Sequence, residues 1–311
     1  MAKQTLAIVL SVFNEEKNIT ASLQSAKFAD EIIVVDHGST DTTVEKAKKF
    51  TKHIFVQEND PIAIDYQKNY GFEKATTDWI LSLDADERIP EDLQKEILHM
   101  LETHSDTING YWIPRKNIIF NKWIEHSLWW PDYQLRLFRK GKARFPKKSV
   151  HTSLEIDGAT EKFQSGLLHE NYQSISQYMR KMNDIYTENE ALTFMEKNPH
   201  FQWQDMIRLP VKDFCKTFFL QKGYKDGVHG LALSILQAIY TELIVLKAWE
   251  KQGFPDKTDT NFLNNIQTEV KKNEAEVKYW FLSSMLDHTK SPLKKILYRV
   301  RRKNEQTKTV R

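Results

Sequence analysis

Short apolar runs alternate with helix-spaced segments through the first 90 residues, and this alternation constrains the fold more than any other feature. Strands that are apolar along their whole length are buried on both faces, so helices must cover both sides of a parallel sheet. The sequence therefore predicts an α/β domain with a largely parallel sheet. The predicted strands are 6–13, 31–35, 53–57 and 78–83, and the predicted helices are 15–28, 40–50 and 62–75, with a further helix from Pro90.

The composition of the chain changes after this region. Aromatic and β-branched residues dominate 108–165, which predicts a mixed or antiparallel extension of the sheet. From 172 onward the spacing is helical. The clearest helix is 228–250, where Glu242 and Lys247 indicate a packed helix rather than a spanning one. We therefore predict one domain over 1–170 and a helical region over 171–311.

Charge and cysteine content exclude several classes of protein. The chain has 45 basic and 42 acidic residues, and this balance does not indicate a nucleic-acid binder. Cys215 is the single cysteine, so an internal disulfide and a cysteine-rich zinc site are excluded. The first residues lead into a short apolar run rather than a signal peptide, and we expect a cytoplasmic protein without a spanning helix.

Polar motifs follow three of the apolar runs, and the carboxyl ends of parallel strands meet at one edge of a sheet. The motifs are Asn14-Glu15-Glu16, Asp36–Asp41 and Asp84-Ala85-Asp86. Asp84 and Asp86 are alternate residues of an extended chain and can face one spot. Two carboxylates there suit Mg²⁺ or Mn²⁺ bridged to the phosphates of a substrate. The glycines form neither a dinucleotide-binding nor a Walker pattern.

These motifs resemble those of family 2 glycosyltransferases with the GT-A fold, over about residues 5–170. The resemblance implies a Rossmann-like mixed sheet covered by helices, with a nucleotide-binding half at 1–105, an acceptor half at 106–170 and a helical carboxyl-terminal extension. The stretch Trp129–Arg139 resembles sequences of the subgroup that builds bacterial lipopolysaccharide cores. The stretch Gly223–Gly227 also fits that subgroup, less specifically. The motifs that carry the resemblance are Val12–Glu16, Val34–Thr42, Gln67–Asn69 and Leu83–Glu87.

The resemblance also implies roles for single residues. Glu15 and Asp36 would contact the nucleoside, Asp84 the ribose and the metal, and Asp86 the metal on the diphosphate. Lys68 would neutralise a phosphate, whereas Glu16 is better explained as an acid at a helix start. The implied donor-binding residues are Phe13, Asn14, Glu15, Asp36, Ser39, Lys68, Asp84 and Ala85, and the implied metal ligands are Asp86 and Asp84.

Inverting transfer in this family needs a carboxylate that takes the proton of the acceptor hydroxyl. Asp132 is the first candidate, because it lies 48 positions after Asp84 among tryptophans that could stack on sugars. Related sequences often read Val-His-Glu where this chain reads Val-His-Thr at 150–152, so Glu155 is the alternative base. His151 and His169 are candidates for contact with the metal or diphosphate, with structural histidines as the alternative reading.

The expected partners are a nucleotide-sugar donor, with a UDP-sugar favoured, and a glycolipid or oligosaccharide acceptor. One rival hypothesis is a nucleotidyltransferase-like enzyme, which would need a glycine-rich loop that residues 6–20 lack. A second is a non-catalytic nucleotide-sugar binding protein, against which the intact Asp84 and Asp86 count. A third is an adaptor for membranes or nucleic acid that depends on the basic tail alone.

The carboxyl-terminal tail combines basic and apolar residues. On a helix, Leu293, Ile296, Leu297 and Val300 form one apolar stripe, and basic residues occupy much of the remaining surface. This pattern is typical of a helix that lies on an anionic membrane surface, here the inner face of the plasma membrane. The alternative is a helix docked on its own domain with a solvated basic face.

Overall fold

The structure, a computed structural model, describes residues 3–60, 65–103, 106–147, 153–256 and 260–310. The chain forms two compact units. The first comprises Met1–Ile119 and Trp129–Asn171, and the second comprises Phe120–Leu128 and Tyr172–Arg311. The predicted boundary at 170/171 did not include the short segment Phe120–Leu128, which groups with the helical unit through contacts distant in sequence.

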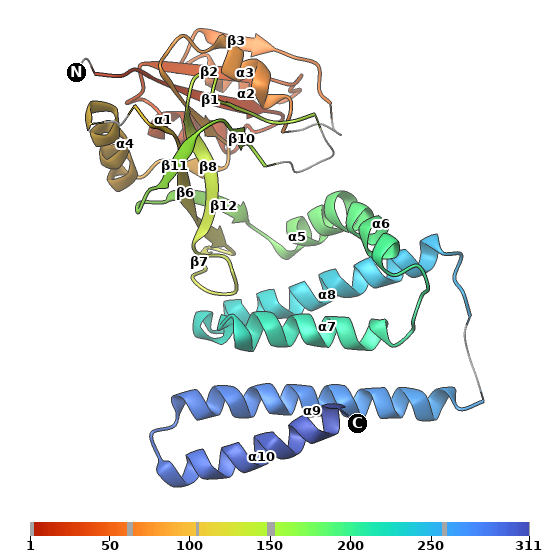
Figure 1. The fold of residues 1–311 in the computed structure, drawn as a ribbon. Helices are drawn as coiled ribbons and strands as arrows, with labels where there is room; N and C mark the ends of the chain where they lie inside the picture. Colours follow the sequence, from red (N-terminus) through yellow and green to blue (C-terminus); the bar gives the residue numbers. More distant parts are fainter. Residues whose placement is uncertain (1–2, 61–64, 104–105, 148–152, 257–259, 311) are drawn as a thin grey trace. The chain divides into compact units, whose positions relative to one another are not determined.

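A mixed sheet forms the centre of the first unit (Figure 1). Its strands follow the order β3-β2-β1-β4-β8-β6-β12-β5, and β11 pairs with β6. Strands β3, β2, β1 and β4 are parallel, whereas β8 is antiparallel to both β4 and β6. The predicted parallel half with an antiparallel extension is therefore confirmed. The bounds are β1 Leu6–Val12, β2 Glu31–Asp36, β3 His53–Val56, β4 Trp79–Leu83, β5 Glu87–Arg88, β6 Ile108–Ile119, β8 Asp132–Arg139, β11 Ala159–Lys162 and β12 Leu167–Tyr172. A separate two-stranded sheet pairs β9 Ala143–Arg144 with β10 Glu155–Ile156.

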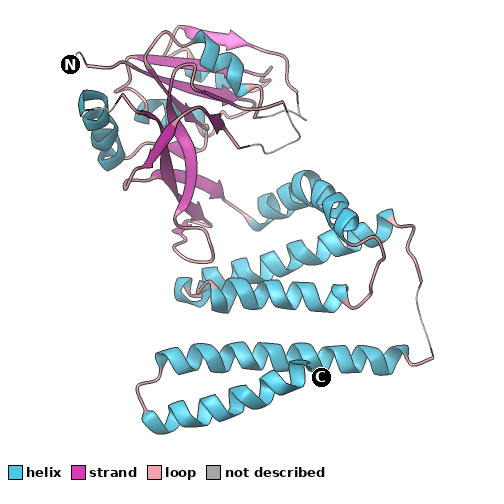
Figure 2. Ribbon diagram, viewed as in Figure 1, coloured by secondary structure: helices cyan, strands magenta, loops and turns pink. Residues whose placement is uncertain are grey.

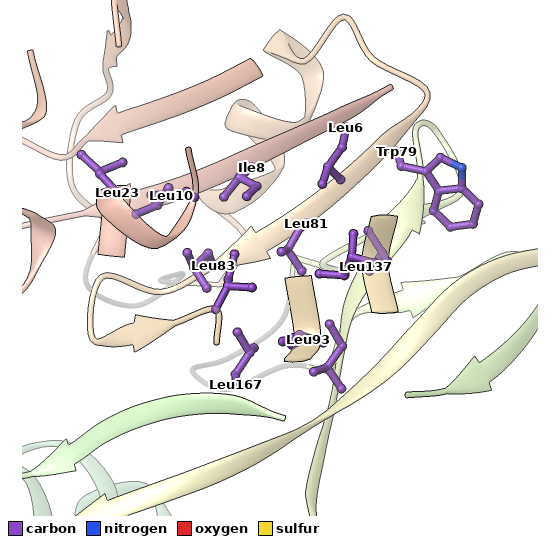
Figure 3. Close-up of a cluster of buried hydrophobic side chains, with 14 of the residues drawn as sticks. Leu6, Ile8, Leu10, Leu23, Trp79, Leu81, Leu83, Leu93, Leu137 and Leu167 are labelled. Carbon is purple, nitrogen blue, oxygen red and sulfur yellow. The ribbon is translucent and has the colours of Figure 1, made fainter. Parts of the chain in front are cut away.

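The period of two in the strands divides the core between the two faces of the sheet. Along β1, Leu6, Ile8 and Leu10 enter one buried cluster, and Ala7 and Val9 enter another. Figure 3 shows the first cluster, where side chains of β1 and β4 meet those of the covering helices. Both faces are buried, which is why these strands are apolar throughout.

Helices cover both faces of the parallel half. On the first face, α1, α2 and α4 contribute Leu23, Ala47 and Leu93. On the opposite face, α3 contributes Phe72, and a Cβ on Gly71 would lie 2.6 Å from a methyl group of Val9. Glycine thus allows α3 to approach the sheet closely. The bounds are α1 Ile19–Ser25, α2 Thr43–Ala47, α3 Lys68–Lys74 and α4 Glu91–Thr103.

The first two helices are shorter than predicted, because polar residues before them bond to each other instead of extending a helix. The Asn14 side chain accepts a hydrogen bond from the Thr40 backbone N–H at 2.8 Å, and the Glu15 N–H donates to the Thr43 hydroxyl at 2.8 Å. Asn14 itself has a φ of 53°, which helices exclude. The loops after β1 and β2 therefore form one connected layer.

The second unit is helical, as predicted (Figure 2). Among the described residues one helix, α8, is long and apolar enough to cross a membrane by length and composition, with a mean hydropathy of 1.6. Polar bonds along it indicate a packed helix: Gln237 and Thr241 both donate to Asp213 on α7, at 3.0 and 2.6 Å. The bounds are β7 Lys122–Trp123, α5 Ile175–Lys181, η1 Met182–Tyr186, α6 Thr187–Lys197, α7 Asp205–Cys215, η2 Lys216–Leu220, η3 Gly223–Asp226, α8 Val228–Lys251, α9 Phe262–His288 and α10 Pro292–Val310.

Candidate functional site

The three polar motifs follow the carboxyl ends of β1, β2 and β4, which are neighbours in the sheet. Direct bonds join the first two motifs, since the Asn14 N–H donates to the Ser39 hydroxyl at 2.9 Å. Arg88 links the first motif to the third: burial lowers its pKa, and the charges of Asp86 and Glu15 oppose that shift. The predicted convergence of the motifs on one edge is therefore observed.

Asp36 ends β2 as a buried carboxylate. It accepts hydrogen bonds from the backbone N–H groups of Gly38 and Ser39, each at 3.2 Å. Gly38 has a φ of 85°, a conformation that suits glycine and lets the turn fold back on the carboxylate. Asp36 thus shapes the loop after β2, and its contact with a nucleoside stays a prediction. Phe13, the first residue after β1, is exposed and open to a stacking partner.

Asp84, directly after β4, carries a cation on each carboxylate oxygen. Lys68 donates to Oδ1 at 2.8 Å and Arg136 donates to Oδ2 at 2.5 Å. Burial would raise the pKa of Asp84, but Arg136 and then Lys68 outweigh it and hold the pKa well below its usual range. Asp84 is therefore an ionised side chain whose partners here are cations, and its predicted contacts with ribose and metal stay untested.

Arg136 and Glu87 form a buried pair that the sequence did not predict as part of the site. Arg136 on β8 bonds Glu87 at 2.8 Å as well as Asp84, and the Asp84 N–H donates to Glu87 at 3.0 Å. Burial would lower the pKa of Arg136, but the two carboxylates raise it. A signal was present in the sequence, because an arginine between Leu135 and Leu137 in a buried strand needs a buried acid.

Asp86 lies beside His169 of β12, with 3.5 Å between Oδ2 and Nε2. The other ring nitrogen of His169 lies 2.7 Å from Asn117 Oδ1. The Asn117 amide nitrogen donates to the Trp129 carbonyl at 2.9 Å, which leaves its oxygen to accept from the imidazole. This arrangement places a proton on Nδ1 and leaves Nε2 facing Asp86. Ala85, between the two aspartates, is buried and accepts from Arg88 through its carbonyl.

Asp132 begins β8 and is held by Arg115 of β6. Arg115 donates to Oδ2 from Nε at 2.8 Å and from Nη2 at 2.5 Å, and Gln134 donates to Oδ1 at 2.9 Å. Burial raises the pKa of Asp132, but Arg115 and these bonds lower it overall. Asn117 lies 3.4 Å from the same carboxylate, so Asp132 and His169 share a neighbour. This brings the candidate base close to the third motif.

Glu155 lies elsewhere, as an exposed residue of β10 in the small sheet with β9. His151, the second histidine candidate, lies outside the described residues, together with Val150 and Thr152. A cavity of about 830 Å³ occurs between α9 and α10 of the second unit, lined by Phe281, Leu282 and Met285 among others. None of the predicted site residues lines this cavity, so its volume does not identify it as the catalytic site.

Several known proteins are similar to this chain. Residues 7–156 match the family described as Glycosyl transferase family 2. A lipopolysaccharide core biosynthesis glycosyltransferase, LpsC of Rhizobium meliloti, is 25% identical over 261 residues, which cover 81% of this chain and 94% of the relative. An uncharacterized glycosyltransferase of Rickettsia typhi is 28% identical over 250 residues, covering 76% and 84%. The crystal structure of residues 1–349 of TarS from S. aureus has a TM-score of 0.40 and 13% identity, covering 82% and 94%.

The chain thus contains an α/β transferase domain with an acidic edge on the parallel half of its sheet. Residues 7–156 match glycosyl transferase family 2, and the protein is a glycosyltransferase that resembles lipopolysaccharide-core enzymes. The predicted mixed sheet covered by helices, the helical carboxyl-terminal region and the enzyme class are confirmed.

Proposed function

We propose that the protein transfers a sugar, with inversion, from a nucleotide-sugar donor to a glycolipid or surface-glycan acceptor, and that it requires a divalent cation. The observation that carries the proposal is the convergence of Asn14–Glu15, Asp36–Ser39 and Asp84–Asp86 on one sheet edge. A ligand at such an edge meets loops from several strands, as is usual in open α/β sheets. We favour UDP as the nucleoside diphosphate, with Phe13, Glu15 and Asp36 as its nearest contacts.

The residues of the third motif fit a divalent cation. Asp86 offers a carboxylate oxygen and His169 a ring nitrogen, 3.5 Å apart, and two donors at this separation can share one ion. The bond from His169 to Asn117 is the support that a ligating histidine requires. Among the described residues no group of three or more potential side-chain ligands gathers, so diphosphate oxygens and water would complete the shell. A bound Mg²⁺ or Mn²⁺ would offset charge that develops on the departing diphosphate.

The cation pair around Asp84 supports binding of the donor in a second way. Lys68 and Arg136 bring positive charge to an edge that is otherwise acidic, which lowers the repulsion of a diphosphate. Asp84 keeps both cations in place, and Lys68, at the start of α3, is the one that we propose turns to the phosphate. The start of a helix also favours negative charge.

In the proposed reaction the oxygen of an acceptor hydroxyl forms a bond to the anomeric carbon of the donor sugar. The bond between that carbon and the diphosphate oxygen breaks, and the diphosphate keeps the electron pair. Asp132 takes the proton of the hydroxyl, acting as a general base. Its ionised carboxylate, held by Arg115 and Gln134, supports this assignment. Glu155 stays the alternative base.

We place the reaction at the cytoplasmic face of the plasma membrane, where a soluble donor meets a lipid-linked acceptor. The helix α10 supports this placement, because Leu293, Ile296, Leu297 and Val300 are all exposed on it. Basic residues surround this stripe, as in helices that lie on anionic membranes.

A thermal-shift screen of nucleotide sugars, with and without Mn²⁺, tests the proposed function. A ligand raises the melting temperature according to its affinity and concentration. We expect a stabilising shift from at least one nucleotide sugar, and a larger shift when Mn²⁺ is present. No shift from any nucleotide sugar with Mn²⁺ at millimolar concentrations would contradict the proposal.

A further inference from the structure

One end of the second unit is assembled from three segments that are distant in sequence. The segment Phe120–Leu128 is bonded to η2 and η3, since Ser127 donates to the carbonyls of Gln221 at 3.0 Å and Thr217 at 2.9 Å. The buried carboxylate of Asp226 accepts from the backbone N–H of His126 at 2.9 Å. This end is therefore a rigid platform, although it contains little regular structure.

The junction between α9 and α10 belongs to the same end (Figure 1). His288, the last residue of α9, packs edge-on against Tyr224 of η3, with ring centroids 5.2 Å apart. Two helical turns earlier, Phe281 of α9 packs against Phe219 of η2, with ring centroids 4.7 Å apart. The first turn of α10 begins only four residues after His288, so its exposed residues lie near this end of the unit.

Large apolar side chains project from every segment of this end. Leu128 is 72% exposed, Leu220 59%, Val228 80% and Leu293 80%. Single exposed apolar residues are normal, but four from three segments gathered at one end of a rigid platform indicate a binding surface. Each lies within five residues of a contact described above, so the fold holds them together.

Lysines surround these apolar side chains. Seven exposed lysines lie in the same segments, against two exposed acids, Glu125 and Asp287. A ring of lysines around apolar side chains matches the anionic headgroups and acyl region of a bilayer, because the ammonium groups stay at the phosphates while the apolar tips enter. The lysines are Lys122, Lys216, Lys222, Lys225, Lys290, Lys294 and Lys295.

We propose that this lysine-ringed end, and not α10 alone, is the surface that docks on an anionic lipid bilayer. Leu220, Val228 and Leu128 enter the headgroup region together with the start of α10. The proposal rests on the proposed function, which places the acceptor in a membrane. It adds a connection: Leu128, at the docking end, precedes the candidate base Asp132 by only four residues along the chain.

Vesicle co-sedimentation of the full chain tests the proposal, with vesicles of phosphatidylglycerol and phosphatidylcholine compared with phosphatidylcholine alone. The test variant is Leu220→Glu with Val228→Glu. The matched control is Leu263→Glu with Val270→Glu, which makes the same chemical change at residues 78% and 49% exposed. These control positions are on α9, roughly 37 and 27 Å along the helix from His288, at a rise of about 1.5 Å per residue.

We expect the wild type to bind anionic but not neutral vesicles. The test variant should bind them roughly tenfold more weakly or worse, because it loses apolar contacts and adds charge that anionic lipid repels, and the control should bind as the wild type does. Wild-type binding by the test variant, equal weakening of both variants, or binding indifferent to lipid charge would overturn the proposal. Donor turnover without vesicles is measured in parallel, since its absence would contradict the proposed function and leave the docking result standing.

Discussion

At the residue scale, the site depends on buried acidic and basic side chains that compensate each other's charge. Arg136 lies between Asp84 and Glu87, and Glu87 is fully buried. A buried carboxylate that loses its cation keeps its desolvation cost without compensation. Arg136 is therefore a structural requirement of the sheet edge that holds Asp84.

We predict that Arg136→Gln lowers the free energy of unfolding by about 3 kcal/mol, the usual cost of removing one partner of a buried ion pair. Arg136→Lys should restore only part of this, because the lysine ammonium is more strongly hydrated than the guanidinium, whose Nη2 donates to both carboxylates. Urea denaturation measures the change. A loss under about 1 kcal/mol in Arg136→Gln would show that water already screens the pair.

We predict that Asp132→Asn lowers kcat steeply while donor affinity stays near that of the wild type, as expected for an interaction made only in the transition state. Arg115 helps to hold the pKa of Asp132 below its usual value, so the carboxylate stays ionised to a lower pH than an ordinary aspartate does. The kcat–pH profile should therefore show no loss from this group between pH 8 and pH 5. An active Asp132→Asn beside an inactive Glu155→Gln would place the base on β10.

The sequence predicted the acids of the site better than their partners. Asp36, Asp84 and Asp86 could be predicted because each motif follows an apolar run, and parallel strands bring such motifs together. Arg136, Glu87 and Arg115 could not be paired from the sequence, because their bonds join strands whose register depends on the folded sheet. Local patterns do not record that register.

At the element scale, close packing of helices on the sheet determines where the loops of the site begin. The helix α3, which starts at Lys68, lies so close to β1 and β2 that a Cβ at Gly71 would be 2.6 Å from Val9 and 3.0 Å from Val35. The sequence predicted a helix here from its spacing, but a close approach of this kind depends on the two partner strands. The short lengths of α1 and α2 also depend on tertiary contacts that local spacing does not reveal, since hydrogen bonds between the two loops compete with helix extension.

We predict that Gly71→Val destabilises the protein by about 1–3 kcal/mol, the usual cost of overpacking a well-filled core. Glu73→Val, on the exposed side of the same helix, is the control for the helix propensity of valine. Thermal unfolding of both variants measures the difference. Equal melting temperatures for the two variants would mean that α3 can move away from the sheet without cost.

At the scale of the whole molecule, the protein divides its tasks between two units. The first contains the residues proposed for the donor, the metal and the base, and the second contains the lysine-ringed end. The two are connected by three passes of the chain, next to Ile119, Leu128 and Asn171. The sequence indicated the change from sheet to helices, but it could not assign Phe120–Leu128 to the second unit. That assignment depends on long-range bonds to Asp226 and Gln221.

We predict that UDP with Mn²⁺ slows amide hydrogen exchange only in the first unit. The protected segments should be 12–16, 36–42 and 84–88, because a ligand stabilises the structure that it contacts. The helix α9 should exchange at an unchanged rate. Hydrogen exchange followed by mass spectrometry resolves these segments, and protection confined to α9 or α10 would place the nucleotide in the wrong unit for this account.

Metal-dependent turnover of a nucleotide sugar by the wild type and Asp86→Ala is the most direct test of the central claim. The control is Asp157→Ala, which removes an exposed aspartate far along the chain from the motif. We predict that Mn²⁺ activates the wild type and the control alike. Asp86→Ala should lose about 100-fold or more, because the cation supplies several kcal/mol of transition-state stabilisation. The stability of Asp86→Ala should match that of the wild type, because removing one carboxylate lowers the repulsion among the acids of this edge. Turnover by Asp86→Ala at the wild-type rate, with the same response to Mn²⁺, would contradict the account.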